Sequence, residues 1–69
     1  MTEYIFMTDK NFKIVIKHDY GDDWQYDIHD QDKDGSIIGG GSCGPSATSV
    51  EEALAFVQKF HDIGTITTT

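Results

Sequence analysis

Seven aspartates are concentrated in the middle of the chain, and they are the side chains best placed to do chemistry. They fall within sixteen consecutive positions: Asp19, Asp22, Asp23, Asp27, Asp30, Asp32 and Asp34. Carboxylates at this density can attract a basic partner through charge complementarity, or they can converge on a hard cation. They can also form a solvated face that keeps a small protein soluble. The prediction of a binding surface for a basic partner rests on these seven residues.

Part of this cluster has the spacing of a calcium-binding loop. Residues 30–37 match the first eight positions of the EF-hand loop, in which alternate carboxylates bind the cation and a glycine allows a sharp bend. The match then ends, because the twelfth position should be a bidentate Glu and is Gly41. The flanking residues also have the pattern of strands rather than helices. We therefore interpret the stretch as a hairpin turn, with a weak calcium site at Asp30, Asp32 and Asp34 as the alternative.

The remaining motifs do not indicate an enzyme. Gly39–Gly44 contains the letters of a dinucleotide-binding motif, but five residues beginning with Pro45 separate it from the predicted helix, and no Lys follows. Cys43 is the only cysteine, which fits a reducing compartment, and no third residue would orient a Cys–His pair. The histidines lack the spacing of zinc ligands: His18, His29 and His61. We expect no catalytic residue and no cofactor.

Composition restricts the partners. With 69 residues, the chain has the size of one small domain. Twelve acidic residues outnumber five basic residues, all of them Lys, for a net charge of −7. Nucleic-acid binding needs a basic patch, and Arg is the usual phosphate and guanine ligand, so direct nucleic-acid binding is not expected. No apolar run approaches the roughly 20 residues of a membrane helix, and no signal-peptide pattern is present. We expect a cytoplasmic protein without a membrane partner.

Alternation of apolar and polar residues predicts the strands that must position the aspartates. Tyr4–Met7 is a short β-rich run, followed by a turn over Thr8–Asn11. Phe12–Lys17 and Trp24–His29 both alternate with period two, and Ser36–Ile38 is a short fourth strand or a continuation of the hairpin. Adjacent strands of this kind favour an antiparallel sheet. Its core face would carry Phe12, Ile14, Ile16, Trp24, Tyr26 and Ile28.

One helix follows a glycine-rich loop over residues 39–48. Ser49 is the expected N-cap of a helix over 50–62, Glu52 completes a capping box, and Gly64 marks the stop. The apolar stripe comprises Val50, Ala53, Leu54, Val57 and Phe60, widened by Phe56 and Ile63. We predict an α+β two-layer sandwich, a three- or four-stranded antiparallel sheet with one C-terminal helix packed on one face. Residues 1–64 would form this single domain, and residues 65–69 a flexible tail.

Two resemblances bear on function. Trp24–Ile28, Gly35–Ile38 and the helix start Thr48–Leu54 resemble the HicB-type antitoxin half, a small βββα module. That resemblance covers about half of the chain and implies the protein-binding part only, because no DNA-binding appendage is present. In size and acidity the chain is also similar to phage-encoded inhibitors such as anti-CRISPR proteins, a likeness that transfers no residues.

These observations predict a non-enzymatic, acidic protein-binding module. Its role would be to inhibit or regulate a larger nucleic-acid-handling protein complex by occlusion, with carboxylates occupying the place of phosphates on a basic surface. The alternatives are the weak calcium-binding module and an antitoxin-like dimerisation module. A homodimer would form through an exposed edge strand, Tyr4–Met7 or Ser36–Ile38.

Overall fold

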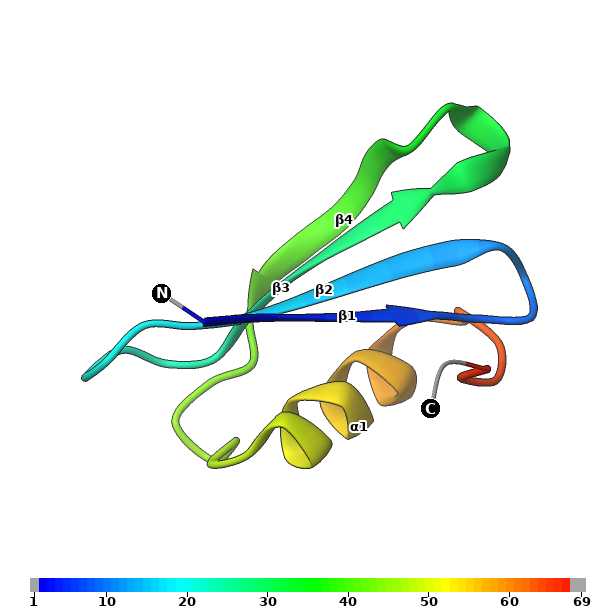
Figure 1. The fold of residues 1–69 in the computed structure, drawn as a ribbon. Coiled ribbons are helices and arrows are strands. Elements are labelled where there is room, and N and C mark those ends of the chain that lie inside the picture. Colours follow the sequence, from blue (N-terminus) through cyan, green and yellow to red (C-terminus); the bar gives the residue numbers. More distant parts are fainter. Residues whose placement is uncertain (1, 68–69) are drawn as a thin grey trace.

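A computed structural model describes residues 2–67 and contains a single antiparallel sheet with one helix on it. The four strands lie side by side in the order in which they occur in the chain, and the helix contacts β2 and β3 (Figure 1). The predicted α+β sheet with one C-terminal helix is confirmed. The elements are β1 (Thr2–Met7), β2 (Phe12–His18), β3 (Gln25–Asp30), the 3₁₀ turn η1 (Gln31–Lys33), β4 (Ser36–Ser42) and α1 (Val50–Phe60).

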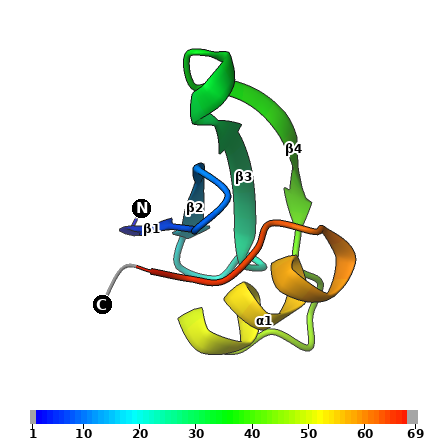
Figure 2. The same ribbon diagram turned by 90° about the vertical axis from the view of Figure 1, so that its right-hand side faces the viewer.

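Period-two alternation explains how the sheet covers its core. Ile14 and Ile16 of β2 are fully buried, and the register pairs them with Ile28 and Tyr26 of β3 on the same face. Turned by 90°, the molecule shows α1 on this side of the sheet, while the far end of the β3–β4 hairpin extends beyond the helix (Figure 2). Over residues 2–67, the opposite face of the sheet carries no helix.

The helix begins where the sequence predicts and ends earlier. The Ser49 hydroxyl accepts a hydrogen bond from the Glu52 backbone N–H at 3.2 Å, as an N-cap does. Ala53 and Val57 are fully buried against the sheet. The predicted end at Asp62 is wrong, because His61 is already in an extended conformation and its Nε2 lies 2.8 Å from the Tyr26 hydroxyl. The helix therefore stops at Phe60.

Two details of the predicted packing also need correction. Phe60 is 60% exposed rather than part of the buried stripe, because it is the last residue of the helix and the backbone becomes extended at His61. The glycine-rich stretch is not a loop over its whole length, since Gly39–Ser42 is the second half of β4. A Cβ at Gly40 would lie 2.9 Å from the Tyr26 carbonyl oxygen, so glycine allows β4 to approach β3 closely.

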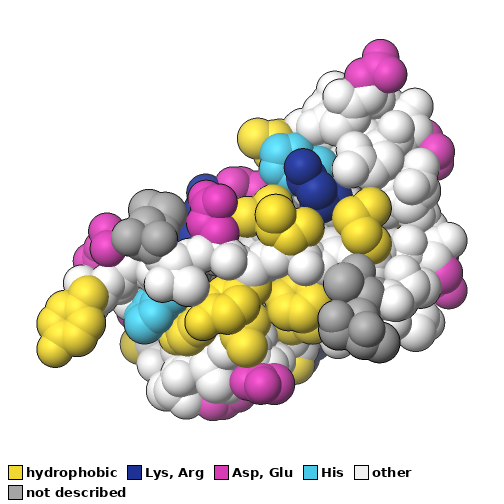
Figure 3. All heavy atoms as spheres, viewed as in Figure 1, with side chains coloured by type: hydrophobic (Ala, Val, Ile, Leu, Met, Phe, Trp, Pro, Cys, Tyr) yellow, Lys and Arg dark blue, Asp and Glu magenta, His cyan; other side chains and the backbone are white. Residues whose placement is uncertain are grey.

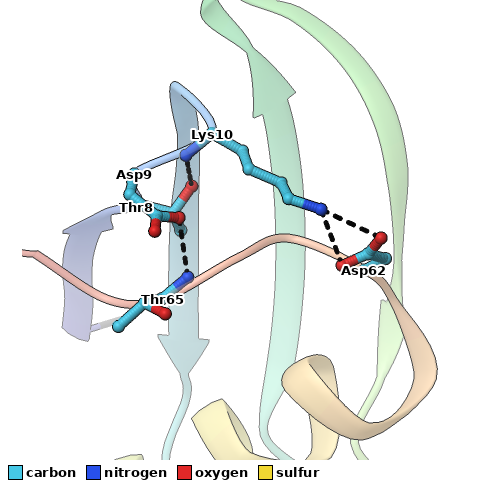
Figure 4. Close-up of polar contacts among 5 residues, drawn as sticks. All are labelled: Thr8, Asp9, Lys10, Asp62 and Thr65. Atoms are coloured by element: carbon cyan, nitrogen blue, oxygen red, sulfur yellow. Dashed lines mark hydrogen bonds and ion pairs between the residues drawn. The ribbon is translucent and has the colours of Figure 1, made fainter.

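The C-terminal segment lies against the turn between β1 and β2 (Figure 4). The Asp9 backbone N–H donates to the Thr65 carbonyl at 2.9 Å, and the Thr65 N–H donates to Asp9 Oδ1 at 2.8 Å. The Lys10 ammonium pairs with Asp62 at 3.0 Å nearby. Thr65 and Thr67 of the expected tail thus form hydrogen bonds, while residues 68 and 69 lie outside the described residues. Over residues 2–67, no helix has the length and apolar character needed to cross a bilayer.

Candidate functional site

The aspartates separate into two groups at opposite ends of the sheet. Asp19, Asp22 and Asp23 belong to the loop between β2 and β3, whereas Asp30, Asp32 and Asp34 lie at or beyond the other end of β3. β3 itself spans Gln25–Asp30, a length of roughly 17 Å for an extended strand. Acidic side chains appear at both of these ends in the space-filling view (Figure 3). The seven residues therefore do not form one continuous surface.

The β2–β3 loop gathers three of the predicted residues around a shallow hollow. Asp19, Asp22 and Asp23 line it together with Lys17 and Gln25. All three aspartates are exposed to solvent. Inside the loop, the Asp22 backbone N–H donates to the Asp19 carbonyl at 3.0 Å. These contacts leave the Asp22 and Asp23 carboxylates at the surface of a defined turn.

The base of the same loop is held by stacked rings. His18 ends β2 and Trp24 precedes β3, and their rings stack with centroids 4.1 Å apart and planes 5° apart. Trp24 is also bound to the buried residue Cys43, because the Trp24 carbonyl accepts a hydrogen bond from the Cys43 backbone N–H at 2.7 Å. The loop is thus mounted on a rigid base, which lowers the conformational entropy lost when a partner binds.

Tyr20 is the residue of this loop that the sequence reasoning missed. Its side chain is fully exposed to solvent, between Asp19 and Gly21. The signal was an aromatic residue inside a polar, glycine-containing loop, where no sheet face could bury it. Exposed Tyr side chains are frequent anchors of protein–protein interfaces, because they offer contact area with few rotatable bonds.

Asp27 differs from the loop aspartates. It lies in β3 on the face of the sheet opposite the helix, and its Oδ2 is 2.6 Å from Lys17 Nζ. Both side chains are only about a quarter exposed, at 25% and 27%. A carboxylate with a close cation already beside it offers little charge to a second basic partner. Its placement assigns Asp27 to the sheet rather than to an acidic binding loop.

The aspartates at the end of β3 and just after it build a turn. Asp30 caps η1 by accepting the Asp32 backbone N–H at 3.0 Å, and Asp32 accepts the Asn11 side-chain amide at 2.8 Å. Asp34 and Gly35 both have positive φ, at 58° and 78°. The alternating aspartates of residues 30–34 therefore belong to a turn that Asp30 caps and that ends in two residues with left-handed backbone conformation. Among residues 2–67, no group of three His, Cys, Asp or Glu side chains lies close enough to hold a metal ion.

Cys43 and two of the histidines are engaged in packing. The thiol is buried, 1% exposed, with its Sγ 3.9 Å from the Ala53 carbonyl. Burial raises the pKa of the Cys43 thiol, which keeps it in the protonated, weakly nucleophilic form. His61 contacts the Tyr26 hydroxyl, and His29 Nδ1 lies 2.9 Å from the Gly35 carbonyl oxygen. Within residues 2–67, none of these three hydrogen bonds therefore joins the Cys43 thiol to a histidine ring, as a Cys–His nucleophile would need.

The buried thiol predicts a loss of stability at alkaline pH. A folded-state pKa above the unfolded value means that the folded state keeps its proton while the unfolded state releases it, so stability falls as the pH rises through that window. Burial raises the pKa of Tyr26 as well, with a smaller contribution from Cys43. We expect Cys43→Ala to lose unfolding free energy less steeply than the wild type as the pH rises above about 8.5, the ordinary pKa of a thiol. Urea titrations across this range measure both slopes, and equal slopes would contradict the prediction.

Comparisons of the chain with protein-family models, with curated proteins and with solved structures find no match. Function is therefore argued from the placement of the side chains described above. The feature that stands out is the β2–β3 loop, with its exposed tyrosine and three aspartates.

Proposed function

We propose that this chain is an acidic, non-enzymatic binding module that inhibits or regulates a larger nucleic-acid-handling protein. The observation that carries the proposal is the β2–β3 loop, in which Asp19, Asp22 and Asp23 surround a hollow beside the fully exposed Tyr20. The net charge of −7 and the absence of Arg favour a basic partner over a nucleic acid. In size and acidity, this chain is similar to phage-encoded inhibitors of the anti-CRISPR type.

The mechanism would be occlusion of a basic surface. Carboxylates on the loop would take the places of phosphate groups and pair with Lys or Arg of the partner. The Tyr20 ring would supply the central contact, because an aromatic face attracts a guanidinium or ammonium group and excludes water around it. The stacked His18 and Trp24 rings would keep the loop in the binding conformation.

A comparison of two charge-matched variants tests which acidic group binds. Asp22→Asn/Asp23→Asn removes two loop carboxylates, and Asp34→Asn/Glu51→Gln removes two exposed carboxylates elsewhere, so both variants reach the same net charge. Asn tolerates the left-handed backbone at position 34. The immobilised wild type would first capture its partner at low salt from a lysate of the cells that produce it. The captured partner should be released at high salt, because salt screens the attraction between exposed charges. The affinity of the purified partner for each variant is then measured by calorimetry.

We expect the loop variant to bind the partner at least about tenfold more weakly, while the control variant stays within about threefold of the wild type. Tyr20→Ala, made in the wild type, is also expected to weaken binding, but it removes no charge and should leave the salt dependence of the affinity unchanged. Displacement of nucleic acid from the partner by the wild type would support occlusion. Equal weakening by both variants would mean that net charge, not the loop, drives binding, and salt-independent binding would contradict the acidic-surface proposal.

A further inference from the structure

β1 lies at an edge of the sheet, and its hydrogen-bonding groups divide by residue parity. The Thr8 N–H donates to the Phe12 carbonyl at 3.0 Å, and this pair continues the register in which Phe6 faces Ile14 and Tyr4 faces Ile16. In an antiparallel ladder, every second pair exchanges hydrogen bonds, so the even-numbered residues of β1 bond to β2. The N–H and C=O groups of Glu3, Ile5 and Met7 therefore point away from the sheet.

The C-terminal segment already occupies part of this edge. The Thr67 N–H donates to the Met7 carbonyl at 2.9 Å, and Thr8 forms an isolated antiparallel bridge with Ile66. The edge that this segment leaves open among the described residues runs over Thr2–Phe6, with outward groups at Glu3 and Ile5. Two outward-facing residues separated by one form a short, self-complementary template.

The open part of β1 lacks the features that usually protect an edge. It contains no Pro, no Gly and no bulge, and Glu3 is its only charged residue. Ile5 is 54% exposed on one face and Tyr4 is 39% exposed on the other. Hydrophobic side chains flank the strand's backbone above and below in the space-filling view (Figure 3). The other edge strand, β4, has three consecutive glycines and a register shift opposite Ile28 and His29.

Only one two-fold register fits these constraints. Pairing about Glu3 places the two Glu3 side chains directly opposite each other, which is destabilising. Pairing about Ile5 places Glu3 opposite Met7, whose carbonyl already accepts from Thr67. Pairing about Tyr4 places Glu3 opposite the partner's Ile5, so that all the outward groups of these two residues are used.

We propose that two copies of this chain associate through antiparallel pairing of β1, centred on Tyr4, to form a continuous eight-stranded sheet. The two Tyr4 rings then lie opposite each other in a non-hydrogen-bonded pair, where side chains approach most closely. Each Tyr4 ring is already supported by Trp24, with centroids 6.0 Å apart. Thr2 would face the partner's Phe6, just short of the position that Thr67 occupies. The proposal is independent of the partner-binding role of the β2–β3 loop.

Molecular mass in solution is the first test. A short strand pair buries less than a standard interface, so we expect a weak dimer whose mass rises from 7.7 kDa toward twice that value between about 10 µM and 1 mM. Ile5→Pro removes an outward N–H and keeps the bonds between β1 and β2, because proline is tolerated on the open side of an edge strand. This variant is expected to remain monomeric over the same range. A wild type that stays at 7.7 kDa at about 1 mM would overturn the proposal.

Two charged substitutions at the same position test the register. Ile5→Glu places a carboxylate opposite the partner's Glu3 and should raise the dissociation constant about tenfold. Ile5→Lys places an ammonium there and should keep dimerisation near the wild-type level. Ile37→Glu, on the other edge strand and 62% exposed, is the control and should dimerise normally.

Amide exchange provides a readout that needs no variant. Exchange at Glu3 and Ile5 should slow as the wild-type concentration rises, while exchange at Asp22 and Asp23 stays constant. Dimerisation with unchanged exchange at Glu3 and Ile5, or equal effects of Ile5→Glu and Ile37→Glu, would assign the contact to another surface and contradict the proposal.

Discussion

Ile14→Ala is expected to lower the free energy of unfolding by about 2–5 kcal/mol, the cost of deleting a buried branched side chain and leaving a cavity. Ile14 is fully buried at the centre of β2, between Phe6 of β1 and Ile28 of β3. A chain of 69 residues has a total stability of only about 3–10 kcal/mol. The substitution should therefore remove a large share of the total stability.

Trp24 makes this measurement direct. It is the only Trp and is 9% exposed within the core, so its fluorescence reports the loss of packing during a urea titration. Ile37→Ala is the matched control, because Ile37 lies in β4 but is 62% exposed, and its cost should stay within about 0.5 kcal/mol. If Ile14→Ala cost no more than Ile37→Ala, Ile14 would not be part of the sheet–helix core.

The positions that the sequence predicts well are those where one local rule decides the outcome. Ile14 and Ile16 are two residues apart in β2 and share one face, and Ile28 lies on the same face of β3, as a period of two requires. The helix start is predictable for a similar reason. Ser49 and Glu52 have the spacing of a cap, and cap geometry involves only residues that are neighbours in the chain.

The positions that are predicted less well depend on residues far away in the chain. Glycines at 39–41 have low strand propensity, so local composition favours a loop. They form a strand because they pair with Tyr26, Asp27 and Ile28 of β3, and β3 lies so close that a Cβ at Gly40 would meet the Tyr26 carbonyl. The end of the helix likewise depends on Tyr26, whose hydroxyl contacts His61 from 35 positions away. Propensity contains no information about either contact.

The candidate site illustrates the same limit. Aspartates that are close in sequence suggest one surface, but the extended β3 separates Asp23 from Asp30 by most of the length of the sheet. The carboxylates of Asp30 and Asp32 also have partners in the turn that they build. Charge density along a chain predicts the sign of the surface potential, whereas the topology of the strands decides which charges act together.

Gly64→Ala is expected to destabilise the protein by about 2–5 kcal/mol, through backbone strain and steric overlap together. Gly64 has φ of +84°, a conformation that disfavours any side chain. A Cβ there would overlap Asp9 Oδ1 and lie 2.8 Å from Lys10 Cγ. Both neighbours are held in place, because Asp9 accepts from the Thr65 N–H and Lys10 pairs with Asp62.

Gly21→Ala separates the two causes. Gly21 has nearly the same φ, +86°, but a Cβ at this position would have no neighbour within 4 Å, so this variant should show the backbone strain alone, about 1–2 kcal/mol. Urea titrations followed by Trp24 fluorescence give both values. A larger loss for Gly64→Ala would mean that the segment after α1 is held against the β1–β2 turn in solution. Equal losses would mean that this segment moves away at little cost, and that its hydrogen bonds to Asp9 contribute little to stability.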